Sequence, residues 1–308
     1  RESMAQISST QPNVTAVILN TNRRQDTLAC LASLADCRYP NFKTIVLDNA
    51  STDGSNEAIH ATYPQVEILP ITENKGYAGN NNVGIAAALE RGADWVFVLN
   101  EDTILDPDCV GRMVEAGEAA PQIGIVGPLV YHHDEPTIIQ SAGGAMDSKL
   151  NAWHMGENEP DRGQFQQTRD VDWISGCAIM VHRKVIEDVG VLDERFFYYW
   201  EETEWCLRSR RAGWRIVNVP AARLWHKGVQ RDYRPPANVS YYNTRNHLLM
   251  LQKHSAPLWV RANLWFQIAR TLASWTIKPK WRDQRDHRDA MWQGVRDFQM
   301  QRWGKRPA

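Results

Sequence analysis

The fold of this chain is decided by the stretch Val96-Phe97-Val98-Leu99-Asn100-Glu101-Asp102. Its first four residues form a continuous apolar run, which is typical of a strand buried on both faces of a sheet. Three side chains that carry oxygen follow at once, and strand alternation points Asn100 and Asp102 to the same side. The stretch therefore predicts a buried strand that delivers polar groups to one edge of a sheet.

The same arrangement recurs on the N-terminal side of this stretch. Apolar runs predict strands over 14–19, 44–47 and 66–69, and helical patterns begin at Asp26, near residue 56 and at Asn80. Each strand runs into a polar loop. Continuous apolar strands that alternate with helices indicate an α/β protein with a mainly parallel sheet, covered by helices on both faces, with ligands bound beyond the carboxyl ends of the strands.

The pattern changes after Asp102. We expect a helix over 108–119, strands over 123–130, 173–181 and 214–219, a turn and a helix over 196–212, and a mobile loop over 132–168. From Asn238 onward the chain reads as helical, with breaks at Pro257 and Pro279. The predicted organisation is a disordered or tag-derived segment over 1–12, a mixed-sheet catalytic domain over 13–237 and a helical region over 238–308.

Composition narrows the classes of protein to consider. With 308 residues, 43% of them hydrophobic, the chain can bury a large core. Its formal net charge of -1 gives no overall attraction to nucleic acid, and we expect no nucleic-acid partner. The five cysteines include no C-x-x-C pair, which favours reduced thiols in a cytoplasmic protein. No apolar run approaches the roughly 20 residues of a membrane span.

Two loops could carry the chemistry of a hard cation and a nucleotide. Carboxylate and amide oxygens, as in Asn100-Glu101-Asp102, suit Mg²⁺ or Mn²⁺, although a plain strand-end turn explains the same residues. The loop 48–54 resembles a calcium loop, yet it lacks the closing Glu. There Asp48 can accept the imide N–H of uracil or thymine, whereas residues 51–53 look like turn and N-cap residues.

Two further segments combine polar groups with a helix start. Residues 74–82 place glycines and amide side chains before a helix N-terminus, which favours phosphate and sugar oxygens, although capping alone explains the Asn residues. Glu201 and Glu202 begin another helix, and a favourable helix dipole explains them too. Aromatic residues surround this pair, and such rings stack on sugars and desolvate a general base. They are Phe196, Phe197, Tyr198, Tyr199, Trp200 and Trp205.

Taken together and in this order, these segments resemble the family 2 glycosyltransferases of the GT-A (Rossmann-like) fold, most closely the bacterial rhamnosyltransferase and galactofuranosyltransferase-like branch. The resemblance runs from about Val14 to Gly304, and it rests on the combination of motifs. It implies a set of residues that bind the nucleotide and the donor sugar. These are Thr21, Asn22, Asp48, Asn74, Gly76, Asn80, Asn100, Glu101, Trp173 and Gly176.

The resemblance also implies a metal site and a general base. The Asp-x-Asp element of the family falls on Asn100-Glu101-Asp102, with Asn in place of the first Asp. Asp102 and His226 are the implied ligands of Mg²⁺ or Mn²⁺, with Asn100 beside them. The acidic pair of the family falls on Glu201 and Glu202, both Glu where members commonly have at least one Asp, and we take Glu201 as the base.

The implied reaction is an inverting transfer from a dTDP- or UDP-sugar to a glycan or lipid-linked glycan, with L-rhamnose from dTDP-rhamnose as the expected donor. Two alternatives remain. A sugar-nucleotide pyrophosphorylase needs a glycine-rich loop after the first strand, and Asn20-Thr21-Asn22-Arg23 has no glycine. A non-catalytic sugar-nucleotide or glycan-binding relative would not need Glu201, Asp102 and His226, which this chain has.

The helices after Pro257 carry tryptophans and basic residues around a broad apolar face. Such a helix suits a membrane interface close to a lipid-linked acceptor, and it would place the protein at the inner face of the cell membrane. Packing against the catalytic domain, or against a second subunit in a homodimer, explains the pattern equally well.

Overall fold

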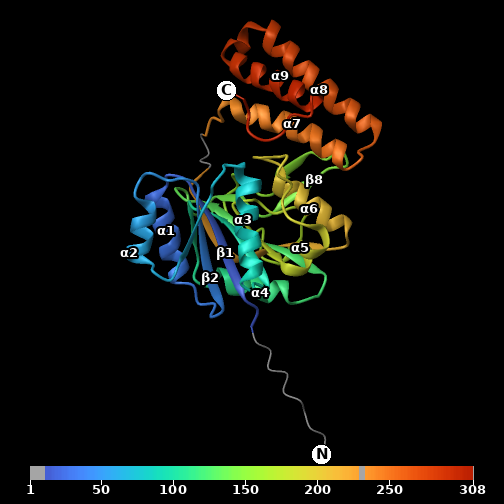
Figure 1. Cartoon of the computed structure of the whole chain (residues 1–308). Coiled ribbons are helices and arrows are strands. Elements are labelled where there is room, and N and C mark those ends of the chain that lie inside the picture. Colours follow the sequence, from blue (N-terminus) through green and yellow to red (C-terminus); the bar gives the residue numbers. More distant parts are fainter. Residues whose placement is uncertain (1–10, 229–232, 308) are drawn as a thin grey trace, which may run out of the picture.

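The computed structural model of the chain describes residues 11–228 and 233–307. The segment predicted to be disordered or tag-derived, 1–12, falls mostly outside these residues. A sheet-bearing part forms the lower half of the molecule in Figure 1, and the long C-terminal helices lie above it.

Among the described residues, ten strands form the main sheet, in the order β10-β12-β6-β11-β4-β1-β2-β3, with β5 paired to β12 and β7 to β6. They are β1 (Val14–Asn20), β2 (Phe42–Asp48), β3 (Glu67–Pro70), β4 (Trp95–Asn100), β5 (Thr103–Leu105), β6 (Ile123–His132), β7 (Ile139–Ser141), β10 (Arg169–Asp170), β11 (Ala178–His182) and β12 (Arg215–His226). Only β11 interrupts the parallel run of long strands, because it lies antiparallel between β4 and β6. The predicted mixed, mainly parallel sheet is confirmed.

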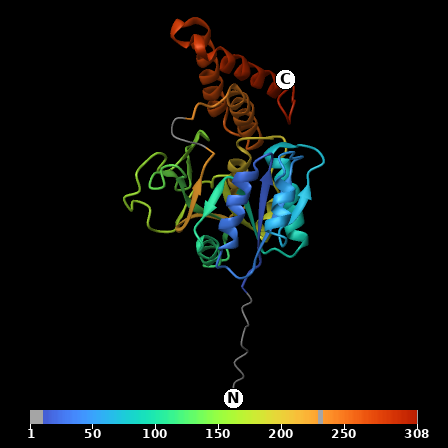
Figure 2. The same cartoon turned by 90° about the vertical axis from the view of Figure 1, so that its left-hand side faces the viewer.

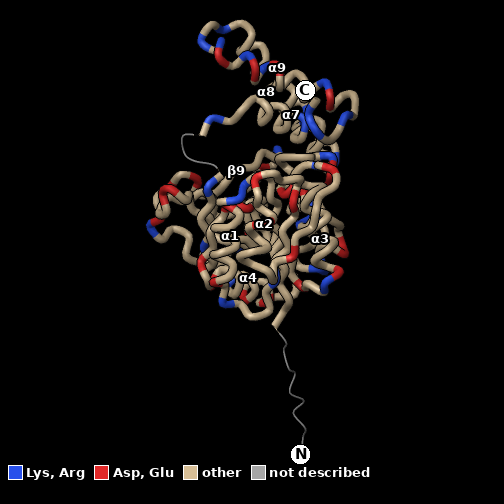
Figure 3. Tube along the Cα trace, turned by 60° about the vertical axis from the view of Figure 1, so that its left-hand side comes forward, with Lys and Arg blue, Asp and Glu red and all other residues tan. Residues whose placement is uncertain are grey.

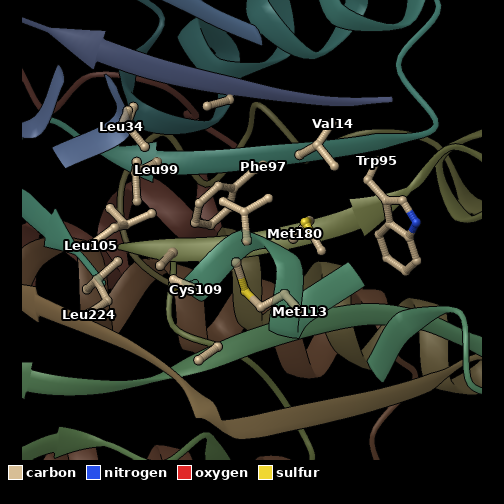
Figure 4. Packing of buried hydrophobic residues seen from close by; sticks show 14 of the residues in the cluster. Val14, Leu34, Trp95, Phe97, Leu99, Leu105, Cys109, Met113, Met180 and Leu224 are labelled. Atoms are coloured by element: carbon tan, nitrogen blue, oxygen red, sulfur yellow. The ribbon is translucent and has the colours of Figure 1, made fainter. Parts of the chain in front are cut away.

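Helices cover both faces of this sheet. They are α1 (Arg24–Ala35), α2 (Ser55–Thr62), α3 (Gly76–Glu90), α4 (Cys109–Gly117), α5 (Arg183–Val189) and α6 (Glu201–Arg211). Strand alternation divides the core: Phe97 and Leu99 pack with α1 and α4, whereas Val96 and Val98 pack with α3 and α5. Figure 4 shows part of the first cluster, in which Met113 of α4 lies against the sheet.

Two local predictions were wrong. The stretch 132–168, expected to be a loop, holds β7 and the separate hairpin of β8 (Gly144–Met146) and β9 (Ala152–His154). These strands are three residues long, too short for a periodic signal, yet Ile139 and Ala142 are fully buried. The strand expected from Trp173 begins only at Ala178. Trp173 itself packs as a core residue and does not pair in the main sheet.

The C-terminal helices are α7 (Ala237–Lys253), α8 (Leu258–Ile277) and α9 (Arg285–Gln299), with a 3₁₀ turn over Pro279–Gln284 between α8 and α9. The predicted breaks at Pro257 and Pro279 are confirmed. Helix α7 has two buried sides, because Leu249 and Met250 pack against the sheet-bearing part while Leu248 and Leu251 pack with α8 and α9. Figure 2 shows from a second side that the C-terminal helices lie on the sheet-bearing part. Within the described chain, no helix combines the length and apolarity needed to traverse a bilayer.

Candidate active site

The polar residues singled out in the sequence gather at the edge of the sheet where the parallel strands end. Strand β1 ends at Asn20, β2 at Asp48, β4 at Asn100 and β12 at His226. The register sets Asn20 beside Asp48, and it sets Leu19 beside Asn100. Since these strands point the same way, their last residues share one edge, as in other open α/β sheets that bind ligands there.

The loops after β1 and β2 hold each other in place around Asp48. Asn22 Oδ1 accepts a hydrogen bond from the Thr52 amide at 2.7 Å, and Asn49 Nδ2 donates to Thr21 Oγ1 at 3.1 Å. Asp48 is buried, and its two oxygens accept from the Ser51 amide at 3.2 Å and from an Asn56 side chain at 2.9 Å. A carboxylate has about four acceptor positions, so Asp48 can still receive a base N–H.

The loop 48–54 is not built as a calcium site. Asp53 Oδ2 accepts from the Arg24 amide at 2.8 Å, and Asp53 Oδ1 accepts from the Ser55 amide at 3.1 Å. Its carboxylate is therefore used to join α1 and α2. The N-cap residue of α2 is Gly54, which lies in the left-handed region and provides no side-chain cap. The prediction that the N-cap lies within residues 51–53 was therefore wrong.

Asn74, Gly76 and Asn80 lie around the start of α3, which begins four residues earlier than predicted. Asn80 Oδ1 accepts from the Lys75 amide and Asn74 Oδ1 accepts from the Gly76 amide, both at 2.9 Å. Asn80 is 1% exposed, so its side chain serves the helix start. Gly76 has φ +73°, and a Cβ there would lie 2.3 Å from the Phe197 carbonyl oxygen. A second role in donor binding stays a prediction for these residues.

Asn100, Asp102 and His226 come together at the ends of β4 and β12. His226 Nε2 lies 3.1 Å from Asp102 Oδ1 and 3.4 Å from Asn100 Nδ2. Asp102 and His226 are each 7% exposed. The residues that the resemblance assigned to one metal site thus lie in contact, although 124 positions separate Asp102 from His226 in the sequence.

A residue that the sequence did not single out orients the His226 ring. His226 Nδ1 donates to Gln140 Oε1 at 2.8 Å, which leaves the lone pair of Nε2 directed toward Asp102 and Asn100. This is the tautomer that a metal-binding imidazole needs, with its other nitrogen fixed by a hydrogen bond. Gln140 lies in the stretch 132–168, where the sequence had no pattern that could reveal this contact.

The residues at this position fit a divalent cation that shares its coordination with a diphosphate. Asp102 Oδ1 is buried and receives no hydrogen bond, despite its closeness to His226. Gly228 keeps the space beside these side chains open, because a Cβ there would lie 2.9 Å from both Asp102 Oδ2 and His226 Nε2. Over residues 11–228 and 233–307, no three His, Cys, Asp or Glu residues form a complete metal cluster. Mg²⁺ in phosphate sites commonly needs only one or two protein ligands.

The two carboxyl groups after β4 differ in acidity. Burial pushes the pKa of Asp102 upward, but when His226 is protonated at Nε2 its hydrogen bond and charge outweigh burial and hold that pKa below its ordinary value. Burial and the charge of Asp102 raise the pKa of Glu101 to about 7. Asp102 is therefore the one of the pair that stays ionised over the wider pH range.

The turn over 196–200 presents the acidic pair. Phe197, Tyr199 and Trp200 have φ of 64°, 68° and 77°, in the left-handed region that is unfavourable for residues with a Cβ. Each such residue costs on the order of 1–3 kcal/mol and persists only where its surroundings hold it. The chain leaves this turn directly into α6, whose first residues are Glu201 and Glu202.

Glu201 and Glu202 each have a buried oxygen without a hydrogen-bond partner. Glu201 is 3% exposed, and Oε2 of each glutamate is buried without a hydrogen-bond partner. Burial, and next to it the charge of Glu202, raises the pKa of Glu201 well above its ordinary value. Burial also raises the pKa of Glu202, while the backbone amides of Glu202, Thr203 and Gly176 act in the opposite direction. Glu201 is thus the better proton acceptor of the pair.

Several of the aromatic residues around this pair pack within the protein, and sugar stacking by the others, such as the 45% exposed Tyr198, stays a prediction. Phe197 stacks on Tyr242 at 5.7 Å between ring centroids, and Trp200 stacks on His247 at 4.3 Å, both partners being in α7. Trp205 is fully buried in the core. These three rings attach the turn and α6 to α7 and to the core.

The segment before β11 connects the two halves of the site. Gly176 lies against Glu202, because a Cβ there would come within 3.6 Å of the Glu202 Cδ, and its carbonyl accepts from the Tyr77 hydroxyl. The charges of Asp102 and Glu202 both raise the pKa of the Cys177 thiol, so both carboxylates lie near it. Trp173 is 5% exposed and donates to the Ala145 carbonyl at 3.2 Å, which places it in packing.

Comparison with known proteins identifies the family. Residues 15–190 match the model of glycosyl transferase family 2. The chain is 30% identical over 267 residues to the N-acetylglucosaminyl-diphospho-decaprenol L-rhamnosyltransferase of Mycobacterium tuberculosis, covering 79% of this chain and 85% of that one. It is 25% identical to the dTDP-rhamnosyl transferase RfbF of Shigella flexneri, covering 92% and 96%.

The fold has solved counterparts as well. A mannosyltransferase from Pyrobaculum calidifontis, solved in complex with GDP-Man and Mn²⁺, superposes with a TM-score of 0.59 at 14% identity, covering 95% of this chain and 88% of that one. The predicted GT-A fold is confirmed. These matches exclude the pyrophosphorylase alternative, since the chain is a glycosyltransferase. It belongs to glycosyl transferase family 2.

Proposed function

We propose that the chain transfers a sugar, with inversion, from a nucleotide-diphosphate donor to a glycan or lipid-linked glycan acceptor. L-rhamnose from a dTDP donor is the proposed sugar, because the names of both relatives specify a rhamnosyl group and one of them specifies dTDP. The other name specifies a diphospho-decaprenol acceptor, which supports a lipid-linked substrate.

One observation carries this proposal: a buried acidic pair with free oxygens stands at the start of α6, near the contact between Asp102 and His226. Such a layout provides separate places for the leaving group and for the proton of the acceptor. The alternative of a non-catalytic relative gives no reason to bury two carboxyl groups without partners, because each costs free energy that a binding protein need not spend.

Asp102 and His226 would hold the cation, with Asn100 beside them, and Mn²⁺ in the mannosyltransferase structure supports the choice of Mg²⁺ or Mn²⁺. A bound cation supplies positive charge that stabilises the leaving diphosphate. The nucleoside would lie over Thr21 and Asn22, with its base N–H donated to Asp48, at the neighbouring strand ends.

Glu201 takes the proton from the acceptor hydroxyl while the oxygen of that hydroxyl attacks the anomeric carbon of the donor sugar. The bond from that carbon to the phosphate oxygen breaks in the same step, so the configuration inverts. Burial raises the pKa of Glu201 and so strengthens it as a base, whereas Glu202 is paired with backbone amides and helps to keep the proton on Glu201.

The test is transfer by Glu201→Gln compared with Glu202→Gln, the matched change at the adjacent buried position. We expect Glu201→Gln to lower kcat by roughly 10² to 10⁴-fold, the usual contribution of a general base. Donor affinity, measured by calorimetry with dTDP-rhamnose and Mn²⁺, should stay near wild type. Near-normal turnover of Glu201→Gln would overturn the assignment, and a larger loss in Glu202→Gln would move the base to Glu202.

We also propose that one face of α8 lies on a membrane surface. This α8 face consists of Trp259, Phe266, Arg270 and Ile277, which follow one another at helical spacing. Its three hydrophobic members are 56%, 66% and 76% exposed. Helix α8 contains no Asp or Glu, and exposed Lys278 and Lys280 follow it, so the face combines apolar and basic groups as interfacial helices do. Such a surface would bring the site to a lipid-linked acceptor.

A further inference from the structure

The turn over 196–200 is held by two buried side chains of α7, far along the chain. Left-handed residues persist only where other groups fix them, and three of the five residues of this turn are left-handed. The stacking of Phe197 and Trp200 on α7 restrains the side chains. Hydrogen bonds from Arg245 and Asn246 restrain the backbone itself.

Asn246 satisfies the carbonyl groups of the turn. It is fully buried, and its Nδ2 donates to the carbonyl oxygens of Phe196 at 2.8 Å, Tyr198 at 2.9 Å and Tyr199 at 2.8 Å. A single amide group with two protons thus serves three carbonyl groups of the turn.

Arg245 fixes the amide of Asn246 and extends the contact. Its Nε donates to Asn246 Oδ1 at 3.0 Å, and its Nη2 donates to the Phe196 carbonyl at 2.9 Å. Its Nη1 donates to the Gly304 carbonyl at 2.7 Å. Arg245 is fully buried, and its neighbour Tyr241 donates to Asp297 of α9 at 2.9 Å. The Arg245 guanidinium therefore connects the turn both to α7 and to the segment after α9.

We infer that Arg245 and Asn246 are positioning residues of the transfer reaction: they hold the turn so that Glu201 faces the acceptor hydroxyl. We name this pair the α7 clamp. The inference rests on the proposed role of Glu201 as the base. It assigns a catalytic purpose to a helix that lies outside residues 15–190, the part of the chain that matches the family model.

The test compares Asn246→Ala with Asn218→Ala. Asn218 is the matched control, because it is equally buried and donates to main-chain carbonyls at Pro128, 2.8 Å, and Gly127, 3.4 Å, within the sheet. Both variants lose a buried side-chain amide that donates hydrogen bonds to main-chain carbonyls, but only the amide of Asn246 donates to carbonyls of the turn. Arg245→Lys is the second clamp variant, since it keeps the charge but loses the planar fork.

We expect Asn246→Ala to lower kcat by roughly 10²-fold with little change in donor KM, because a displacement of about 1 Å of a catalytic group has that effect. Arg245→Lys should lie between this variant and wild type. Hydrogen exchange should be faster over 196–204 in both clamp variants and unchanged there in Asn218→Ala. Asn218→Ala should retain the wild-type kcat even if its thermal unfolding midpoint falls as far as that of Asn246→Ala.

Two outcomes overturn the clamp: wild-type kcat with wild-type exchange in Asn246→Ala, or equal losses of kcat in Asn246→Ala and Asn218→Ala. If Asn246→Ala does not fold, Arg245→Lys decides by the same two readouts. Failure of the proposed function is distinguishable, because a wild-type protein without transfer activity would refute the role of Glu201 while exchange over 196–204 still reports whether the clamp holds the turn.

Discussion

Asn100 supplies an amide where the family motif has a carboxylate, and its surroundings make this change understandable. Glu101 and Asp102 already crowd two acids at the end of β4, and the pKa of Glu101 is raised to about 7. A third carboxyl group there would increase the repulsion. His226, with its ring fixed by Gln140, supplies a nitrogen ligand instead, from the end of β12 that pairs with β5.

Replacing Asp102 by Ala should abolish the effect of the metal on donor binding. Asp102 is the ionised carboxylate of the site, so its loss leaves His226 without a charged partner for the cation. We expect dTDP affinity with Mn²⁺ to fall at least roughly 10²-fold, the upper range for changes around a metal ligand. Calorimetry with and without EDTA measures it.

Asn100→Ala is the companion variant for that measurement. It removes a neutral neighbour of His226 and should have a much smaller effect on affinity. Equal dTDP affinity of Asp102→Ala and wild type in Mn²⁺ would contradict the metal role of Asp102.

At the residue level, the sequence predicted Asp102, His226, Glu201 and Glu202 through the order of their motifs, and the structure brings Asp102 and His226 into contact. The sequence alone could not reveal the roles of Gln140 or of the α7 clamp. A Gln in a stretch without periodicity and an Arg-Asn pair inside a helix acquire meaning only through contacts with distant segments, 86 residues away for Gln140.

Helix α3 and the turn over 196–200 fit together through a glycine. Gly76 adopts φ +73°, and the Phe197 backbone and ring occupy the space that a side chain would need. The first turn of α3 is therefore part of the support for the acidic pair, and Asn74 and Asn80 keep that turn formed.

Gly76→Ala should destabilise the protein more than Gly92→Ala, the matched change just beyond the other end of the same helix. Gly92 also has positive φ, +80°, but a Cβ there meets nothing within 4 Å. We expect about 1 kcal/mol for Gly92→Ala from the backbone alone. For Gly76→Ala, overpacking should add roughly 1–3 kcal/mol.

Urea unfolding measures both changes, and turnover should fall only in Gly76→Ala, because only this change pushes on Phe197. Equal stability and equal turnover of the two variants would contradict this prediction, because they would show that Phe197 can move away from a Cβ at position 76 without loss of stability or activity.

Elements were predictable in proportion to their length and periodicity. Each long apolar run before Asp102 became a strand, because burial on both faces needs a continuous apolar sequence. The three-residue strands over 139–154 gave no such signal. The aromatic residues 196–200 indicated a special site, but their left-handed backbone could not be read from residue types that rarely adopt it.

Charge divides the whole molecule in two. Residues 233–308 contain 14 Lys and Arg and 4 Asp and Glu, a formal charge of +10. Because the whole chain has a net charge of -1, residues 1–232 carry a formal charge of -11. Acidic segments recur through the sheet-bearing part in Figure 3, whereas α8 carries none. The overall net charge hides this separation, and a negatively charged surface would attract the helices and repel the sheet-bearing part.

The full chain should therefore bind vesicles that contain anionic lipid and bind neutral vesicles weakly. Changing Trp259 and Phe266 of the α8 face to Ser should weaken vesicle binding roughly tenfold or more, because two large apolar side chains no longer enter the interface. Co-sedimentation with vesicles of phosphatidylglycerol and phosphatidylcholine measures it.

Trp153→Ser is the control, since Trp153 is 48% exposed on the β8–β9 hairpin, outside the helical region. Vesicle binding by the wild type that is independent of anionic lipid, or unchanged in the α8 variant, would contradict the membrane role of this face and favour contact with a second subunit.

The position of the α7 clamp also orders events during protein synthesis. The turn and Glu201 leave the ribosome before Asn246, which is 45 residues later in the chain. At the usual rates of translation this interval lasts roughly 2 to 9 s, during which the sheet can form around Asp48 and Asp102. A nascent chain should thus acquire its nucleotide pocket first and its working base second, so that newly made enzyme can hold a donor before it is able to use it.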